Sequence, residues 1–229
     1  MWFGTVGALG RRRFEGLRIG FLAGKKSTMK NSMPRRLVIS TRNAHKVAEI
    51  REILGFGFDV ADLSGLSGVG EVQETGTTFE ENATLKALAV SEQYDGWVLA
   101  DDSGLEVDVL GGAPGVWSAR FSGEGATDAS NRALLLEKLE GVRGKQRSAR
   151  FRCVIVLARR GCKLAAFHGS VEGVIIPQEK GSGGFGYDPL FVPEGHCETF
   201  AQLGADLKNA LSHRARALEG LLAWSGWDE

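Results

Sequence analysis

The chain has 229 residues, of which 43% are hydrophobic and 24% charged, so it is long enough to form a packed core. Its net charge is zero, but residues 1–36 hold nine basic side chains and one acidic, which leaves the remainder with eight net negative charges and argues against a nucleic-acid-binding surface. Three cysteines without a C-x-x-C pair argue against a disulfide framework and favour a reducing compartment such as the cytoplasm. No apolar run approaches the roughly 18 residues of a membrane span.

The first 36 residues differ in composition from the rest of the chain. They are rich in Arg, Lys, Gly and Ser and show little apolar periodicity. An Arg-rich, acid-poor leader is typical of an organelle transit peptide. The alternatives, which we favour, are a disordered tail or an upstream start codon with the folded chain beginning near Met29 or Met33. We expect one folded domain over residues 37–229.

The first half of the folded part alternates apolar strands with amphipathic helices. Residues 37–40 (LVIS) form a predicted buried strand, and the following helix ends at Gly55 and buries Val47, Ile50, Ile53 and Leu54. A second helix is predicted from Thr78 to about Tyr94, with an apolar side of Phe79, Ala83, Leu85, Leu88 and Ala89. Residues 97–100 (WVLA) form another buried strand, which runs into DDSG and then the alternating LEVDVL.

The second half contains a predicted helix over residues 127–139 and two paired strands, 151–158 and 163–176, joined by a turn at Arg160–Gly161. A short strand (LFV) and a helix from about Leu207 to Trp224 complete the chain. Because helices and strands intermix, the predicted class is α/β or mixed α+β.

The segment TRNAHK follows the first strand and opens the first helix. A helix N-terminus presents backbone N–H groups that bind anions. Thr41 and Asn43 add side-chain donors there and Lys46 adds a charge. The alternative is an ordinary helix cap formed by Thr41 or Asn43.

Acidic side chains stand out at two points. Glu74 precedes the second helix, and we interpret it as an oxygen ligand for Mg²⁺. The alternative is that it complements the helix dipole. Asp101 and Asp102 follow an apolar strand, and in extended backbone they point to opposite faces, so that one faces a cleft while the other braces the structure. The alternative is a turn rich in Asp, Ser and Gly.

Lys208, His213 and Arg214 lie at or near the start of the C-terminal helix. We interpret Lys208 as a phosphate contact and the His-Arg pair as donors to an acceptor such as a carbonyl. The alternative is solvated surface.

The stretch GSGGFGYDPLF contains the G-x-G-x-x-G spelling of a dinucleotide-binding turn. That turn must open a helix, but Pro189 and the β-rich LFV follow here, so the match is false. We interpret the glycines as letting the backbone approach a flat ligand, with Phe185 or Tyr187 stacking on a base. The alternative is a Gly-rich loop whose aromatic rings pack on the core.

Six ordered motifs together resemble the inosine/xanthosine triphosphate pyrophosphatase family: TRNAHKVAEI, ETGTTFEENATLKA, ADDSGLEVDVLGGAPGVWSARFSGE, FHGSVEG, GSGGFGYDPLF and LSHRARAL. The resemblance runs from about Leu37 to Leu222. It implies a long mixed β-sheet with flanking helices in two lobes around a cleft, a homodimer and Mg²⁺ dependence. The implied reaction splits a purine nucleoside triphosphate such as ITP, dITP or XTP into the monophosphate and pyrophosphate.

The resemblance also assigns roles to residues. It implies Glu74 and Asp102 as metal ligands, Asp102 as proton acceptor and Lys86 as a further catalytic residue. The residues that it implies as substrate contacts are Thr41, Asn43, Lys46, Ser103, Phe185, Gly186, Tyr187, Asp188, Lys208, His213 and Arg214. Gln73 stands where relatives carry a second acid beside Glu74, and the leader has no counterpart in the compact bacterial pattern.

Two rival functions stay open from the sequence. One is a less specific nucleotide phosphatase that releases orthophosphate, and the other is a non-catalytic nucleotide-binding module. The family reading predicts preference for a 6-oxo purine, because His213 and Arg214 donate to a carbonyl and leave the 6-amino group of adenine unmatched.

Overall fold

The computed structural model describes residues 34–228 except 67 and 71, and the predicted leader up to residue 33 lies outside the described residues. In this described part of the chain, six strands form one mixed sheet in the order β2-β1-β3-β4-β5-β6. Their bounds are β1 Arg35–Ile39, β2 Phe58–Ala61, β3 Trp97–Val107, β4 Ser148–Arg159, β5 Cys162–Ile175 and β6 Phe191–Pro193. Strand β1 is parallel to β2 and β3, and the other pairs are antiparallel. Strand β1 thus includes Arg35 and Arg36 from the predicted leader.

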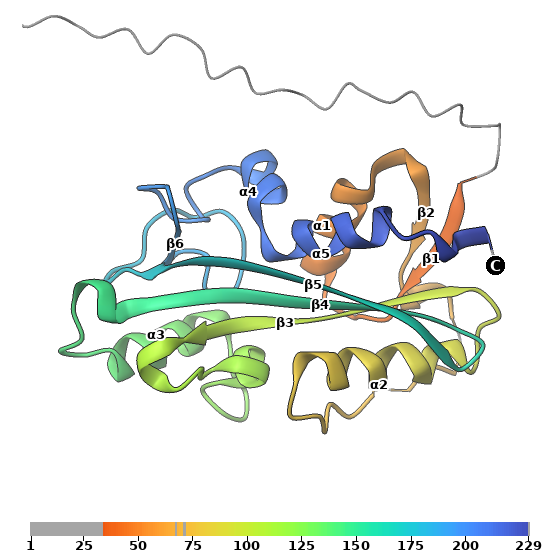
Figure 1. The fold of residues 1–229 in the computed structure, drawn as a ribbon. Coiled ribbons are helices and arrows are strands. Elements are labelled where there is room, and N and C mark those ends of the chain that lie inside the picture. The colour runs from red at the N-terminus through yellow and green to blue at the C-terminus, as the bar shows by residue number, and fades with distance from the viewer. Residues whose placement is uncertain (1–33, 67, 71, 229) are drawn as a thin grey trace, which may run out of the picture. The chain divides into compact units, whose positions relative to one another are not determined.

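Three long strands, β3, β4 and β5, form the spine of the sheet (Figure 1). The pairing of β3 with β4 runs unbroken from Val98↔Ala158 to Val107↔Ala149. The turn interpretation of DDSG is therefore wrong, because both aspartates lie within β3. The hairpin predicted at Arg160–Gly161 is confirmed by the pairing of Arg159 with Cys162.

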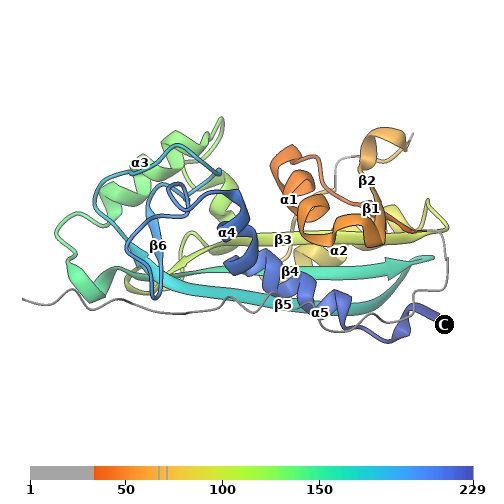
Figure 2. The ribbon, with the colours of Figure 1, turned by 90° about the horizontal axis from the view of Figure 1, so that it is seen from above.

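Within the described residues, five α-helices cover the two faces of the sheet: α1 Ala44–Leu54, α2 Phe79–Ser91, α3 Asp128–Lys138, α4 Ala205–Leu211 and α5 His213–Leu222. Helices α1, α4 and α5 lie on one face, and α2 and α3 on the other (Figures 1 and 2). The predicted class, a mixed sheet with flanking helices, is confirmed. Among the described residues, no helix is long and apolar enough to cross a membrane.

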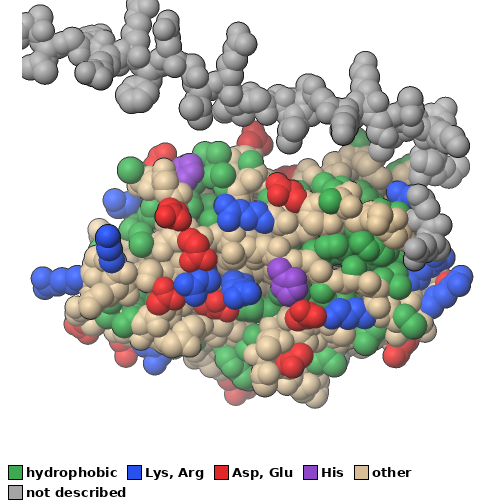
Figure 3. Space-filling model, viewed as in Figure 1, with side chains coloured by type: hydrophobic (Ala, Val, Ile, Leu, Met, Phe, Trp, Pro, Cys, Tyr) green, Lys and Arg blue, Asp and Glu red, His purple; other side chains and the backbone are tan. Residues whose placement is uncertain are grey.

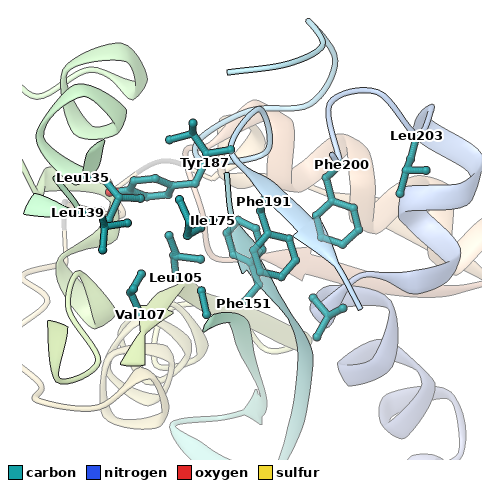
Figure 4. Close-up of a cluster of buried hydrophobic side chains, with 13 residues drawn as sticks. Leu105, Val107, Leu135, Leu139, Phe151, Ile175, Tyr187, Phe191, Phe200 and Leu203 are labelled. Atoms are coloured by element: carbon teal, nitrogen blue, oxygen red, sulfur yellow. The ribbon is translucent and has the colours of Figure 1, made fainter. Parts of the chain in front are cut away.

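The sheet separates the buried side chains into clusters on its two faces. Leu37, Ile50 and Leu218 belong to the cluster under α1 and α5, whereas Phe79 and Ala83 of α2 pack on the opposite face. A third cluster fills the end of the sheet near α3 and β6, where the rings of Phe151, Phe191 and Phe200 meet (Figure 4).

Two predictions about helices are wrong in detail. The single helix predicted to Trp224 is split at Ser212, whose backbone is extended and whose Oγ accepts from the Ala215 N–H to cap α5. Leu85 was expected on the apolar side of α2 but is 37% exposed, whereas Lys86 is buried. The helix thus turns a charged side chain inward.

One face of the molecule carries acidic and basic side chains interleaved across the long strands (Figure 3). Cross-strand ion pairs account for such a pattern, since Arg150 of β4 contacts Glu106 of β3 and Glu172 of β5. This face therefore lacks the basic stripe expected of a nucleic-acid-binding surface.

Candidate active site

A cavity of about 300 Å³ is bordered by residues from both faces of the sheet, including those that precede α1, those of α2, β3 and α5, and the loop before β6. Its volume is at the lower end of the range for small-molecule sites. All the residues predicted from the sequence border it: Thr41, Asn43, Lys46, Glu74, Lys86, Asp102, Ser103, Phe185, Gly186, Tyr187, Asp188, Lys208, His213 and Arg214. Segments more than 100 residues apart in the chain thus meet at one site.

The N-terminus of α1 faces this cavity. Asn43 is the N-cap, and its Oδ1 accepts from the backbone N–H groups of His45 at 3.0 Å and Lys46 at 3.1 Å. The Thr41 Oγ1 accepts from the Asn43 N–H at 3.2 Å. The capping interpretation is therefore right for Asn43. It leaves the positive end of the helix pointing at the cavity, so an anion site there stays a prediction.

Asp101 is fully buried and braces the site from behind. Its carboxylate lies 2.5 Å from Lys46 Nζ and 3.0 Å from Arg214 Nε, and it accepts from Cys153 Sγ at 2.9 Å. Burial opposes the charge, but Arg214 and Lys46 outweigh it and hold the pKa of Asp101 well below its usual value. Asp101 is therefore ionised and fixes two cations on the α1–α5 face.

Asp102 points to the opposite face of β3, toward α2. Lys86 Nζ lies 2.8 Å from its Oδ1 and 3.1 Å from Glu74 Oε1, so one buried lysine joins the two carboxylates. Burial raises the pKa of Asp102, and the Glu74 charge adds to this, although Lys86 acts in the other direction. The expectation that the two neighbouring aspartates take separate roles matches this geometry.

Glu74 and Asp102 fit a hard cation. The Asp102 Oδ2 is buried and has no hydrogen-bond partner in the described part of the chain, so one oxygen is available for a ligand. Within the described residues, no three acidic, histidine or cysteine side chains gather closely enough to hold a metal by themselves. A pair of carboxylates such as Glu74 and Asp102 suits Mg²⁺, because this ion is commonly bound by one or two carboxylates and its coordination is completed by substrate phosphates and water.

His213 and Arg214 lie at the N-terminus of α5. The His213 ring stacks on Phe151 with centroids 4.9 Å apart, and its buried Nδ1 has no partner among the described residues. Burial, reinforced by Arg214, lowers the pKa of His213 well below its ordinary value, so the imidazole is neutral at pH 7. An unpaired nitrogen at a cavity wall is suited to a polar atom of a ligand.

Arg214 is held almost entirely by protein acceptors. Its Nε and Nη2 donate to Asp101, Nη2 also donates to Ser103 Oγ at 3.0 Å, and Nη1 donates to Glu49. Four of its five N–H bonds therefore have acceptors before any ligand arrives. Its predicted role as a donor to the base thus depends on the remaining N–H or on exchange of a partner.

Lys208 of α4 is buried between two acids. Its Nζ lies 2.5 Å from Glu49 Oε1 and 2.6 Å from Asp188 Oδ2. Asp188 also accepts from the Phe185 N–H at 2.8 Å. Gly184 makes this possible, because a Cβ there would lie 2.1 Å from Asp188 Oδ2 and its φ is +71°.

The aromatic residues of the loop before β6 have different environments. The Phe185 ring is half-buried, stacks on His45 with centroids 5.4 Å apart and lies 4.6 Å from Lys208 Nζ. Tyr187 packs in the core near Leu135, and its hydroxyl donates to the Ser118 carbonyl (Figure 4). The core-packing alternative therefore describes Tyr187, while stacking of Phe185 or Tyr187 on a base stays a prediction.

The glycines of this loop serve the protein's own packing. A Cβ on Gly181 or Gly183 would approach the Ala201 backbone, whereas one on Gly186 would meet nothing within 4 Å. The expectation that these glycines make room for a flat ligand is thus wrong at Gly181 and Gly183. No helix follows them, which confirms that the dinucleotide spelling is false.

Three charged residues at or near the cavity were not predicted from the sequence. Glu49 of α1 joins Lys208 and Arg214, Arg120 contacts Glu74, and Asp128 accepts from the Gly186 N–H at 2.6 Å. Glu49 stands three residues after Lys46, on the same side of the helix, and this spacing was the available signal. Nothing local distinguished the other two from surface charges.

The amino-acid sequence matches a protein family and is similar to individual proteins of other organisms. Residues 37–224 match the Ham1 family. A protein of Desulforamulus reducens named dITP/XTP pyrophosphatase is 50% identical over 185 residues, which cover 80% of this chain and 92% of the relative. A protein of Bacillus subtilis with the same name is 46% identical over 185 residues, which cover 80% of this chain and 93% of the relative.

The fold is similar to solved Ham1 structures. The Ham1 protein of Staphylococcus aureus superposes with a TM-score of 0.74 and is 40% identical, covering 82% of this chain and 97% of that one. The HAM1 protein of Coxiella burnetii superposes with a TM-score of 0.74 at 41% identity, covering 82% of this chain and 96% of that one.

Proposed function

Since this chain belongs to the Ham1 family, we propose that it is a nucleoside triphosphate pyrophosphatase that hydrolyses non-canonical purine nucleotides such as ITP, dITP and XTP to the monophosphate and pyrophosphate. The family resemblance inferred from the six motifs is confirmed by the family match and by the identity to proteins named dITP/XTP pyrophosphatase. Removal of such nucleotides from the nucleotide pool is the role that follows from this activity.

The observation that carries the proposal is the meeting of three kinds of group in one cavity. The N-terminus of α1 with Lys46 suits phosphates, and Glu74 with Asp102 suits a divalent cation. The unpaired His213 Nδ1 suits a heteroaromatic base. A triphosphate, its metal and its base need these three kinds of group, which favours a nucleoside triphosphate over a simpler anion.

The reaction adds water across the phosphoanhydride bond between the α and β phosphates, and pyrophosphate leaves. We assign Asp102 as the acceptor of the proton of the attacking water, directly or through a second water. Lys86 keeps the Asp102 Oδ1 in place at 2.8 Å, which leaves Oδ2 for this task or for a ligand. Mg²⁺, held by Glu74 and Asp102, would supply polarisation of the phosphate and a lowered water pKa.

Selectivity for the base is assigned to the end of the cavity that contains Phe185, His213 and Arg214. A buried hydrogen-bonding site rejects a base that leaves its polar atoms unpaired, by on the order of 10⁴-fold. The neutral His213 ring can donate one N–H, which suits the 6-oxo group of hypoxanthine or xanthine. The 6-amino group of adenine is itself a donor and leaves the His213 N–H without an acceptor, so we expect ATP to be a poor substrate.

A Mg²⁺-dependent screen over nucleoside triphosphates tests the proposal. We expect pyrophosphate as the product and a higher kcat/KM for ITP and XTP than for ATP. Release of orthophosphate would favour the rival phosphatase, and binding without turnover would favour the non-catalytic module. We further propose a homodimer located in the cytoplasm, and sedimentation of the purified protein tests the dimer.

A further inference from the structure

Arg120 is a cation of the cavity that the activity above does not use. It ends the short 3-10 helix Gly115–Arg120 and borders the cavity beside Glu74. Its Nη1 lies 3.6 Å from Glu74 Oε2, and its Nη2 donates to the Glu74 carbonyl at 3.4 Å. Both contacts are long, so this guanidinium is only loosely held by the protein.

Three lysines of the site are held tightly. Lys46, Lys86 and Lys208 each lie between 2.5 and 3.1 Å from a carboxylate, and their side chains are at most 14% exposed. The Arg120 side chain is 40% exposed, and Glu74 is its only carboxylate partner among the described residues. A guanidinium has five N–H donors, and most of those on Arg120 are thus available to a ligand.

Trp117 supports Arg120 at the edge of the cavity. The Arg120 guanidinium carbon lies 4.5 Å from the Trp117 ring centroid. This cation–π contact orients the guanidinium without using its N–H donors. Trp117 is itself 56% exposed. The arrangement leaves a planar, preoriented donor group beside the proposed metal ligand.

We propose that Arg120 binds the pyrophosphate half of the substrate, exchanging its contact with Glu74 for phosphate oxygens when the carboxylate is engaged by a cation. This inference rests on the proposed function. An arginine fork matches phosphate oxygens in a bidentate manner, which a lysine cannot do. Phosphates would lie at this end of the cavity, because Glu74 and Asp102 would share their metal with them. The structural alternative is that Arg120 only neutralises Glu74.

Calorimetric titration of the full-length protein separates the two roles. The variants are Arg120→Gln, Arg120→Lys and the control Arg152→Gln. Arg152 lies outside the cavity, is 44% exposed and contacts one carboxylate, Glu106, at 3.8 Å, so its replacement makes the same charge change in a similar setting. The probes are Mg²⁺ alone, pyrophosphate with Mg²⁺, and inosine monophosphate.

We expect Arg120→Gln to weaken pyrophosphate binding about 10- to 100-fold, as the loss of hydrogen bonds to a charged group predicts. The pyrophosphate affinity of Arg120→Lys should lie between those of Arg120→Gln and the wild type, and that of Arg152→Gln should match the wild type. Inosine monophosphate affinity should be unchanged in all variants, and Mg²⁺ alone should bind Arg120→Gln at least as tightly as the wild type, because a competitor for Glu74 is gone.

Unchanged pyrophosphate affinity in Arg120→Gln, in a wild type that binds both pyrophosphate and inosine monophosphate, would overturn this inference and leave the proposed function intact. A wild type that binds neither compound would remove the proposed function and this inference with it.

Discussion

Replacement of Asp101 by asparagine tests the bracing role assigned to this buried carboxylate. Asparagine keeps the shape but removes the charge that neutralises Lys46 and Arg214, although Arg214 keeps Glu49. Breaking a buried ion pair in this way costs about 3–5 kcal/mol of the free energy of unfolding. For a domain of this size each kcal/mol lowers Tm by about 2–4 °C, so we expect a fall of about 6–20 °C.

Asp102→Asn is the matched control, one residue along the same strand. Its partner Lys86 keeps Glu74, so only about 0.5–1.5 kcal/mol of stability should be lost, the usual cost of one hydrogen bond. Urea and thermal unfolding followed by circular dichroism measure both variants, with pyrophosphate release measured in parallel. We expect Asp102→Asn to stay folded and inactive. Near-normal turnover by that variant would refute its role as proton acceptor.

The stabilisation of the folded state by Asp101 depends on pH in one direction. Because its folded-state pKa is held below the unfolded value of about 3.9, the stabilisation is fully present above that pH and is lost as the pH falls through the folded-state pKa. The stability gap between wild type and Asp101→Asn should therefore be constant from about pH 5 to 8 and narrow below about pH 4. A gap that is absent at pH 7, or that narrows as the pH rises, would contradict the assignment.

Three further predictions concern the loop before β6 and the metal. Phe185→Ala should lower the ratio of kcat/KM for ITP over ATP without changing Mg²⁺ binding, whereas simple unfolding of this variant would favour a packing role. Gly184→Ala should weaken nucleotide binding, because its Cβ would displace the Asp188 carboxylate; Gly195→Ala, with φ +81° and nothing within 4 Å, is the control for backbone strain alone. Chelation should abolish pyrophosphate release and added Mg²⁺ restore it, and activity that survives chelation would speak against the metal assignment.

The parts of the fold that were predictable from sequence depend on local signals. The cap at Asn43, the stop at Gly55 and the helix over residues 127–139 each follow from neighbouring residues, and the structure has all three. The pairing of Glu49 with Arg214 joins residues 165 positions apart, and charge alone does not specify which acid meets which base. The site as a set of motifs was therefore predictable, but the network that holds it was not.

Strand β3 shows which part of the site local reasoning could not reach. Extended backbone predicted the opposite directions of Asp101 and Asp102, but a buried charge is unfavourable in a strand unless a partner compensates it. The strand continues because each aspartate meets cations on its own face, Lys46 and Arg214 for Asp101 and Lys86 for Asp102. Those cations come from helices on opposite faces of the sheet, so the compensation is visible only in three dimensions.

Helix α2 illustrates the same conflict between periodicity and chemistry. Apolar spacing placed Leu85 toward the core, but the structure exposes it and buries the neighbouring Lys86. A lysine on the buried side of a helix is expensive unless it is paired, and here Glu74 and Asp102 both pair with it. Places where a sequence departs from its own hydrophobic pattern are commonly functional sites. The exposure of Leu85 and the burial of Lys86 therefore have one cause, since the helix is oriented to bring that lysine to the two carboxylates.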